Sequence, residues 1–251
     1  MTVSAWDRRI ERAGELAKTC PSAAEVLRFY EEIARLQKII YEQLQSMGAG
    51  SRLPELSMLL THFVPLLSLV KRVGPAPLAK MADELAEDRA QWETLLVDQG
   101  DAGDGKQFFA RSLLQPYFEY LASQSNTALS AVQPTCPFCG EKPQATILRG
   151  EGDGGKRSLL CSLCFTEWDF RRILCPNCGE ERERQLPVYT AEEFPHVRIE
   201  ACDTCRTYIK SVDLTRNGLA VPVVDELATI SLTLWADERG YTKLQLNLLG
   251  M

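Results

Sequence analysis

The chain has 251 residues, of which 45% are hydrophobic and 25% charged, a composition typical of an ordinary globular protein. Its net charge is −6, and division at residue 130 leaves 14 basic and 17 acidic residues in each half, or −3 per half. This even acidity argues against nucleic-acid binding, which normally requires a basic surface.

The N-terminal residues contain no apolar core of the kind that signal peptides carry. No apolar stretch approaches the roughly 20 residues needed to cross a bilayer. We therefore expect a cytoplasmic protein without membrane insertion. Thiols stay reduced in the cytoplasm, so the nine cysteines indicate metal binding or redox chemistry rather than a disulfide scaffold.

Residues 1–130 have the apolar periodicity of an all-α bundle of about five helices. A helix is expected over residues 25–46, and Ser22 with Glu25 matches a capping box before it. A second apolar stripe covers residues 56–70. Pro65 within this stripe predicts a kink or a division into two shorter helices.

The rest of the bundle is predicted from turn residues and further apolar stripes. A break is expected at residues 74–77, a helix at 78–97, a loop at 100–105 and a last helix at 108–121. Residues 125–135 are predicted to be a linker between the helices and the cysteine-rich segment that follows, which has a different composition.

An internal repeat built on C-x-x-C pairs follows the linker. Cys136-Pro-Phe-Cys139-Gly140 recurs as Cys175-Pro-Asn-Cys178-Gly179, and Cys161-Ser-Leu-Cys164 recurs as Cys202-Asp-Thr-Cys205. Each copy also contains three short alternating segments that predict strands. These are 142–149, 156–160 and 166–171 in the first copy, and 185–190, 196–201 and 207–213 in the second. The repeat indicates one supersecondary unit used twice.

The repeat predicts two metal sites. A C-x-x-C pair places two sulfurs on one tight turn, and two such turns supply the four thiolates that zinc or a single iron ion binds tetrahedrally. The candidate ligands are Cys136, Cys139, Cys161, Cys164, Cys175, Cys178, Cys202 and Cys205. Sequence order favours joining the first pair with the second and the third with the fourth, and interleaved pairing remains open.

Units of about 40 residues bury little core, so a bound metal would supply much of their folding free energy, ~10 kcal/mol or more. Four protein ligands per ion leave no open coordination position, which favours structural cages over catalytic ones. The chain carries no Ser-His-Asp set, phosphate-binding loop or H-E-x-x-H motif, so we do not expect an enzyme.

Few other residues are candidates for chemistry. His62 is expected on a helix surface, Cys20 as a small half-buried thiol, and His196 is a candidate hydrogen-bond donor to a nearby cysteine sulfur. Trp168 and Tyr208 follow the second pair of each repeat. We expect them to be exposed, where they either shield the metal or contact a partner.

The prediction is an α+β fold made of an N-terminal helical bundle, two tandem rubredoxin-like or zinc-ribbon metal modules and a C-terminal helix. The expected bounds are 1–130 for the bundle, 131–174 and 175–222 for the modules, and 223–251 for the helix and tail. The helix is predicted over residues 225–239, docked on the bundle or on the modules.

Read in order, these motifs resemble the formate dehydrogenase accessory protein FdhE family. The resemblance is carried by Cys136-Pro-x-Cys-Gly, Leu160-Cys-Ser-Leu-Cys with Glu167-Trp168, Cys175-Pro-x-Cys-Gly, and Glu200-Ala-Cys-Asp-Thr-Cys-Arg206 with Tyr208-x-Lys210. Leu114-Gln-Pro-Tyr117 and residues 225–241 are similar to that family as well.

The resemblance implies a cytoplasmic, non-enzymatic protein with a helical domain and two rubredoxin-like modules that bind iron. It also implies a maturation factor that contacts the catalytic subunit of a formate dehydrogenase, the subunit that holds a molybdenum or tungsten pterin. The ligand role carries over to the eight paired cysteines, with two ions of iron or zinc and iron favoured. A rubredoxin-like electron-transfer or thiol-redox protein is the alternative, and the sequence gives no sign of the oligomeric state.

Overall fold

The computed structural model describes residues 4–48, 52–98, 105–125, 132–151 and 154–251. Outside these residues lie most of the predicted loop at 100–105, residues 126–131 of the predicted linker, and residues 152–153 between two predicted strands. The helices before the sheet are α1 Ala5–Thr19, α2 Ala24–Met47, α3 Arg52–Thr61, α4 Phe63–Val73, α5 Ala76–Glu87, α6 Gln91–Asp98 and α7 Lys106–Ser123. They form the N-terminal helical region that the sequence predicted, although the described residues contain seven helices there and the prediction was about five.

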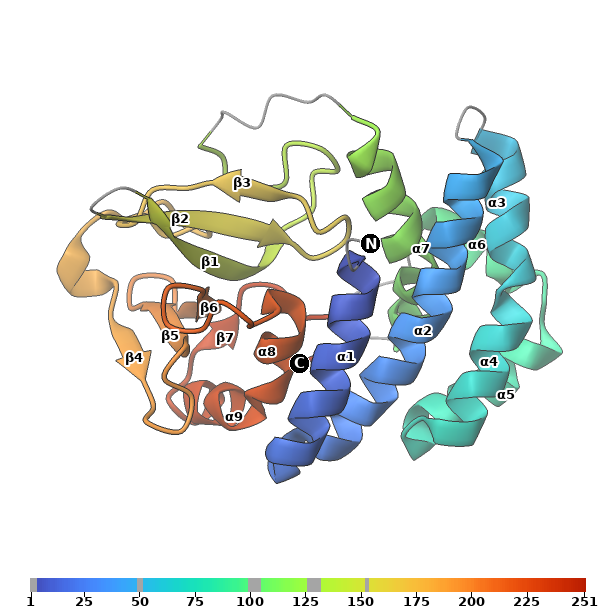
Figure 1. The fold of residues 1–251 in the computed structure, drawn as a ribbon, viewed down its shortest axis with the longest axis horizontal. Helices are drawn as coiled ribbons and strands as arrows, with labels where there is room; N and C mark the ends of the chain where they lie inside the picture. The colour runs from blue at the N-terminus through green and yellow to red at the C-terminus, as the bar shows by residue number, and fades with distance from the viewer. Residues whose placement is uncertain (1–3, 49–51, 99–104, 126–131, 152–153) are drawn as a thin grey trace.

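The strands lie in the second half of the chain, with two helices near its end. They are β1 Pro143–Glu151, β2 Gly154–Cys161, β3 Glu167–Asp169, β4 Val188–Thr190, β5 Val197–Cys202, β6 Thr207–Asp213 and β7 Thr242–Lys243, with α8 Pro222–Ala228 and α9 Ile230–Glu238 between β6 and β7. In Figure 1 the sheet and the two late helices lie on one side, α3 to α6 lie on the other, and α1, α2 and α7 stand between them. The mixed α+β fold is confirmed.

Two details of the early helices differ from the prediction. Ser22 does not cap α2, because it lies inside a 3-10 turn, Pro21–Ala23, and Ala23 precedes α2 without any side-chain cap. A capping serine needs an extended backbone, which this turn does not provide. The stripe with Pro65 does divide into two helices, but the break falls at His62, and Pro65 occupies the first turn of α4 where its missing N–H costs least.

The helix predicted over residues 78–97 is interrupted between α5 and α6. Asp88 Oδ1 accepts a hydrogen bond from Ala90 N at 3.1 Å, a local turn that competes with the helix. Trp92 then stacks on Phe63 at 4.9 Å between ring centroids and donates its indole N–H to Leu85 O. The interruption therefore lets one tryptophan fill the core between three helices.

One segment, Leu56–Val73, is long and apolar enough to span a membrane by length and composition alone, which corrects the expectation that no stretch approaches that length. Such a match is weak support for a membrane span. Helices α3 and α4 divide the segment at His62, and Leu59, Phe63 and Leu66 are at most 1% exposed in the bundle core.

The strands of both repeats form one sheet in the order β3-β2-β1-β6-β5-β4, with β7 paired to β6. Within each repeat the strands are antiparallel, but β1 and β6 pair in parallel and join the two repeats edge to edge. Residues 145–148 of β1 lie against residues 210–213 of β6. The repeat pattern alone did not predict this junction.

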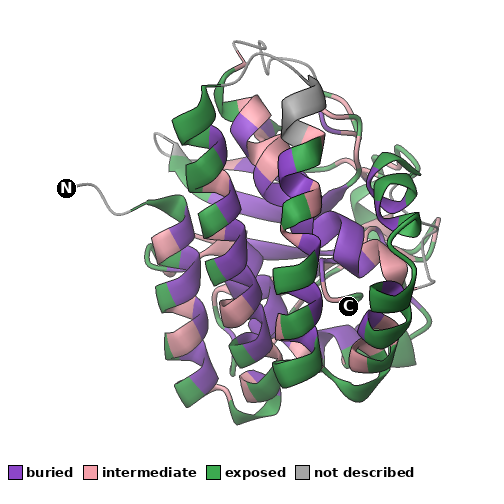
Figure 2. Ribbon diagram, turned by 90° about the vertical axis from the view of Figure 1, so that its right-hand side faces the viewer, coloured by how far each residue is buried: buried purple, intermediate pink, exposed green. Residues whose placement is uncertain are grey.

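The predicted C-terminal helix is broken at Thr229 into α8 and α9. The buried ammonium of Lys210 donates to the carbonyls of Glu226 and Thr229, both at 2.9 Å, and so satisfies the end of α8. Helix α8 packs on α1 and α2 and also on β1 and β6. This helix therefore docks on the bundle and on the modules together. In Figure 2 the buried residues line the inner faces of the helices and the sheet.

Candidate metal centres

The first cluster gathers Cys136, Cys139, Cys161 and Cys164. Cys136 and Cys139 lie on the turn before β1, Cys161 ends β2, and Cys164 lies on the turn after it. The Sγ atoms are 3.5 Å apart between Cys136 and Cys164, 3.3 Å between Cys139 and Cys161, and 3.5 Å between Cys139 and Cys164. The pairing is the one that sequence order favoured.

The second cluster gathers Cys175, Cys178, Cys202 and Cys205 in the same way. Cys202 ends β5, and the other three lie on the turns that flank the β4–β5 hairpin. The Sγ atoms are 3.7 Å apart both between Cys175 and Cys205 and between Cys178 and Cys202. In each cluster all four sulfurs lie within 4.8 Å of one another.

The first turn of each cluster depends on a glycine. Gly140 and Gly179 follow the first pairs with φ of 80° and 76°, and each donates its N–H to the carbonyl of the cysteine four residues earlier, at 2.9 and 3.0 Å. A side chain at positive φ would strain this backbone, so glycine is the residue that closes the turn with least strain.

The second turn of each cluster has features that the sequence reading missed. Phe165 and Arg206, each following the last cysteine, adopt positive φ of 55° and 56° without being glycine. The next residues, Thr166 and Thr207, place their Oγ1 atoms 3.1 and 3.0 Å from the Sγ atoms of Cys164 and Cys205. A threonine at the same position in both copies of the repeat was the sequence signal for this contact.

The sulfur arrangement fits a tetrahedral metal ion. Four thiolates bound to zinc at about 2.3 Å lie about 3.8 Å from one another. The sulfur separations of 3.7 Å in the second cluster match this value, and those in the first are slightly shorter. Backbone N–H groups also point at sulfur: Leu163 N is 3.3 Å from Cys161 Sγ, and Asn177 N is 3.4 Å from Cys175 Sγ.

Protonation in the second cluster is uneven. Burial raises the pKa of Cys202 to about 12. Burial also acts on Cys205, but hydrogen bonds from Thr207 and Asn177 outweigh it and lower the pKa of that thiol to about 6. A cation among the sulfurs would favour the thiolate form at all four positions.

Known proteins are similar to this chain in sequence and in fold. The central domain of FdhE matches residues 135–172, and the C-terminal domain of FdhE matches residues 173–249. The FdhE homolog of Aquifex aeolicus is 29% identical over 96% of this chain and 94% of its own length. The FdhE protein of Escherichia coli K12 is 27% identical over 96% of this chain and 86% of its own.

The crystal structure of the FdhE protein from Pseudomonas aeruginosa superposes with a TM-score of 0.75 at 26% identity, covering 99% of this chain and 96% of that one. The chain is therefore similar to FdhE proteins over nearly its whole length. The similarity covers the helical region as well as the sheet, whereas the matched domains begin at the first cysteine pair.

In this FdhE-like chain, helix α7 holds both turns of the first cluster. Arg111, which is 5% exposed, donates from Nη2 to Glu141 Oε2 and to Ser162 Oγ, both at 3.0 Å. Gln115 Nε2 donates to Ser162 O at 3.0 Å, and Gln115 Oε1 accepts a hydrogen bond from Gln37 Nε2 of α2. Glu141 and Ser162 belong to the two different cysteine turns, so the bundle fixes the first cluster from outside.

A different polar contact joins the repeats near the second cluster. Arg157 of β2 lies against Glu200 of β5, with Nη2 2.8 Å from Oε2, and Arg198 donates to Oε1 of the same carboxylate at 2.8 Å. Glu200 is half-buried, but the two guanidinium groups outweigh the effect of burial and lower its pKa. The three side chains therefore form a largely buried ion-paired group across the module junction.

Trp168 and Tyr208 are only 1% exposed, so the expectation that they are exposed is wrong. Trp168 belongs to the same apolar cluster as Cys161 and Cys164 and donates its indole N–H to Gln133 O at 2.9 Å. It shields the first cluster and is not available to a partner.

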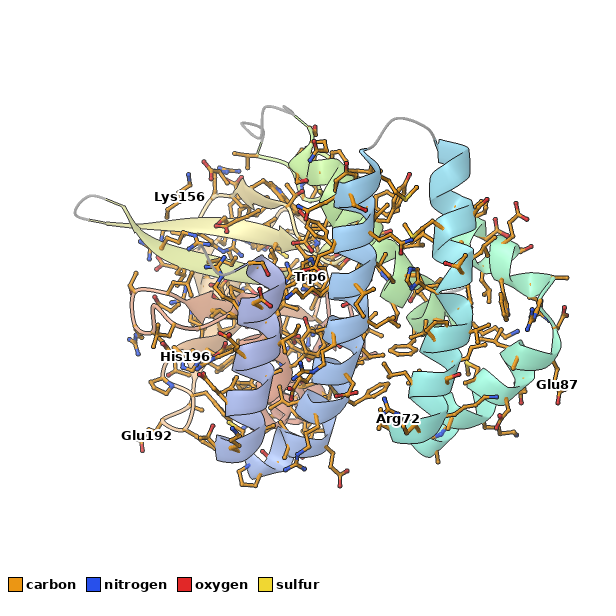
Figure 3. The ribbon with its side chains drawn as sticks, turned by 45° about the vertical axis from the view of Figure 1, so that its right-hand side comes forward. Trp6, Arg72, Glu87, Lys156, Glu192 and His196 are labelled. Carbon is orange, nitrogen blue, oxygen red and sulfur yellow. The ribbon has the colours of Figure 1, made fainter. Side chains whose placement is uncertain are left out.

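The two histidines lie outside both clusters. His196, labelled in Figure 3, places Nε2 2.8 Å from Asp225 Oδ1, and Asp225 also pairs with Arg12 of α1. It therefore ties the second repeat to α8 and is not a donor to a cysteine sulfur. His62 bonds Gln43 Oε1 at 2.8 Å, and the ninth cysteine, Cys20, is half-buried at the end of α1.

Proposed function

We propose that this protein is a metal-bearing accessory protein that assists the assembly or activation of a formate dehydrogenase by binding its catalytic subunit. The observation that carries the proposal is the pair of four-cysteine clusters within an FdhE fold. The eight cysteines are proposed as the ligands of two ions. Four sulfurs suit iron and zinc alike, and the family resemblance favours iron.

We infer four functional units with the bounds 1–130, 131–174, 175–222 and 223–251. The first would supply the helical surface, the next two the metal modules, and the last the connection between them. The division of the FdhE central and C-terminal domains at residues 172 and 173 supports a boundary between the modules.

The protein is proposed to act by binding and not by catalysis. A cage of four cysteines leaves no coordination position for a substrate. Both histidines are engaged in hydrogen bonds at structural positions. The even negative charge supports a cytoplasmic protein that contacts another protein, neither inserting into a membrane nor binding nucleic acid.

The test is capture of a formate dehydrogenase catalytic subunit by the tagged full-length chain. We expect enrichment over an unrelated molybdenum enzyme, and weaker capture by Cys175→Ser than by Cys20→Ser, because Cys20 lies outside both clusters. Equal recovery of both enzymes would count against the proposed partner. Metal analysis of the same preparations should give two ions per chain for Cys20→Ser and fewer for Cys175→Ser.

One observation favours electron transfer as a second candidate. Cys178 of the second cluster is exposed, and electrons reach a buried iron most directly through an exposed ligand. An iron-loaded protein should then show a visible charge-transfer spectrum that bleaches reversibly on reduction. A colourless protein with two tightly held zinc ions would exclude the one-electron version.

A further inference from the structure

The two cysteine clusters have the same geometry but very different surroundings. In the first, Cys136, Cys161 and Cys164 are 3%, 0% and 1% exposed and belong to the main apolar core, and Cys139 is half-buried against that core. In the second, Cys178 is exposed and Cys205 is half-buried. An ion held by the second cluster is therefore open to solvent on one side.

The covering of the first cluster is built from several elements. Leu159 and Leu163 flank it, Trp168 closes one side, and Arg111 and Gln115 of α7 hold its two turns. Opening this cluster would expose part of the bundle core. Loss of its ion therefore requires local unfolding of packed structure.

The second cluster borders a small cavity of about 70 Å³ whose walls include Cys175 and Cys202. Arg157, Arg172 and Arg198 line the same cavity with a single carboxylate, Glu200. Glu200 is already paired with Arg157 and Arg198, whereas Arg172 is exposed at the cavity. The cavity carries an excess of positive charge beside a cluster of thiolates.

We propose that the second cluster is a metal-exchange site that takes up and releases a thiophilic divalent ion, while the first cluster keeps its ion as part of the core. The cavity is the approach for an anionic chelating ligand. This inference rests on the proposed metal binding and goes beyond it by giving the two sites different roles.

The exchange is a ligand substitution without electron transfer. Bonds from the ion to the Sγ atoms of Cys175, Cys178, Cys202 and Cys205 break as bonds to the donor atoms of the incoming ligand form. The released thiolates take up protons or bind the next ion. Because the incoming ligand must reach the ion, access and local charge control the rate.

The first experiment follows zinc release from the zinc-loaded full-length protein with EDTA, together with mapping of newly alkylated cysteines by mass spectrometry. We expect one ion to leave at least about tenfold faster than the other, with early label on Cys175, Cys178, Cys202 and Cys205. Release of both ions at a single rate, or early label on Cys136, Cys139, Cys161 and Cys164, would overturn the proposal.

The second experiment tests the cavity with a matched pair of variants. Arg172→Ala should slow release to EDTA, which is anionic, and leave release to phenanthroline, which is neutral, unchanged. Arg171→Ala is the control, because Arg171 is an exposed neighbour that pairs with Glu181 and does not line the cavity. Equal slowing with both chelators, or the same effect in both variants, would remove the cavity from the exchange.

These outcomes separate the inference from the proposed function. A protein that binds no stoichiometric metal contradicts both. Two ions that leave together contradict only the division of roles, and the accessory function would still be judged by capture of the catalytic subunit.

Discussion

Glu226 of α8 is the side chain whose replacement we expect to affect stability most clearly. It is fully buried, and its carboxylate lies between the ammonium groups of Lys210 and Lys243. Asn247 Nδ2 donates to Glu226 Oε2 at 2.7 Å. Glu226→Gln keeps the shape of the side chain but leaves two buried lysines without a carboxylate.

The size of the effect follows from the pKa of this carboxyl. Burial would raise it, but the interactions with Lys210 and Lys243 prevail and lower the pKa of Glu226 from 4.5 to about 2. At 1.36 kcal/mol per pH unit, this difference corresponds to about 3 kcal/mol of stability at neutral pH. Breaking a buried ion pair by removing one partner costs a similar amount, about 3–5 kcal/mol.

The pH dependence has a definite sign. A carboxyl with a lowered pKa in the folded state stabilises the fold fully above its unfolded pKa of 4.5, and this stability is lost as the pH falls toward about 2. The difference between the wild type and Glu226→Gln should therefore be constant from pH 7 to 5.5. At pH 3 it should shrink to about 1–2 kcal/mol.

The assay is urea unfolding followed by far-ultraviolet circular dichroism at each pH. With a urea m-value of about 3 kcal/mol/M, Glu226→Gln should lower the midpoint by about 1 M at pH 7. Glu238→Gln, at an exposed position on α9, is the matched control and should change the midpoint little. A shift no larger than that of the control, or one as large at pH 3 as at pH 7, would refute the reasoning.

Three further predictions concern the clusters. Cys175→Ser should remove one ion and leave the far-ultraviolet helix signal intact. Cys161→Ser should remove one ion and also lower the midpoint of helix unfolding, because Cys161 lies in the bundle core. Equal unfolding midpoints for the two variants would contradict this prediction. Trp168→Ala should lower the free energy of unfolding in urea by about 3–5 kcal/mol, because the indole is 1% exposed. A loss below about 1 kcal/mol would contradict the place of Trp168 in the core. Gly140→Ala should lower the free energy of unfolding by about 1 kcal/mol through backbone strain alone, because nothing lies within 4 Å of the added methyl group. An unchanged midpoint of urea unfolding would disprove the strain.

The positions of the cysteine turns could be predicted from sequence because they are local. A C-x-x-C-G segment fixes its own turn through one backbone hydrogen bond and a positive φ at Gly140 or Gly179. Long amphipathic helices such as α2 were predictable for the same reason, since their periodicity extends over many residues. The helix boundaries were less predictable. The break at Thr229 depends on a hydrogen bond from Lys210, which is distant along the chain, and the local turn at Asp88 competes with a helical pattern that continues through it.

The sequence by itself determined the eight cysteines, their repeat and the order of their pairs, because each of these is encoded within a few neighbouring residues. Only the tertiary structure decided that β1 and β6 join the two repeats in one sheet, and that Trp168 is buried. It also decided that three ligands of one cluster lie in the main core, whereas the other cluster has an exposed ligand, Cys178. Burial depends on which segments meet across large separations along the chain, and no local pattern of residues records that.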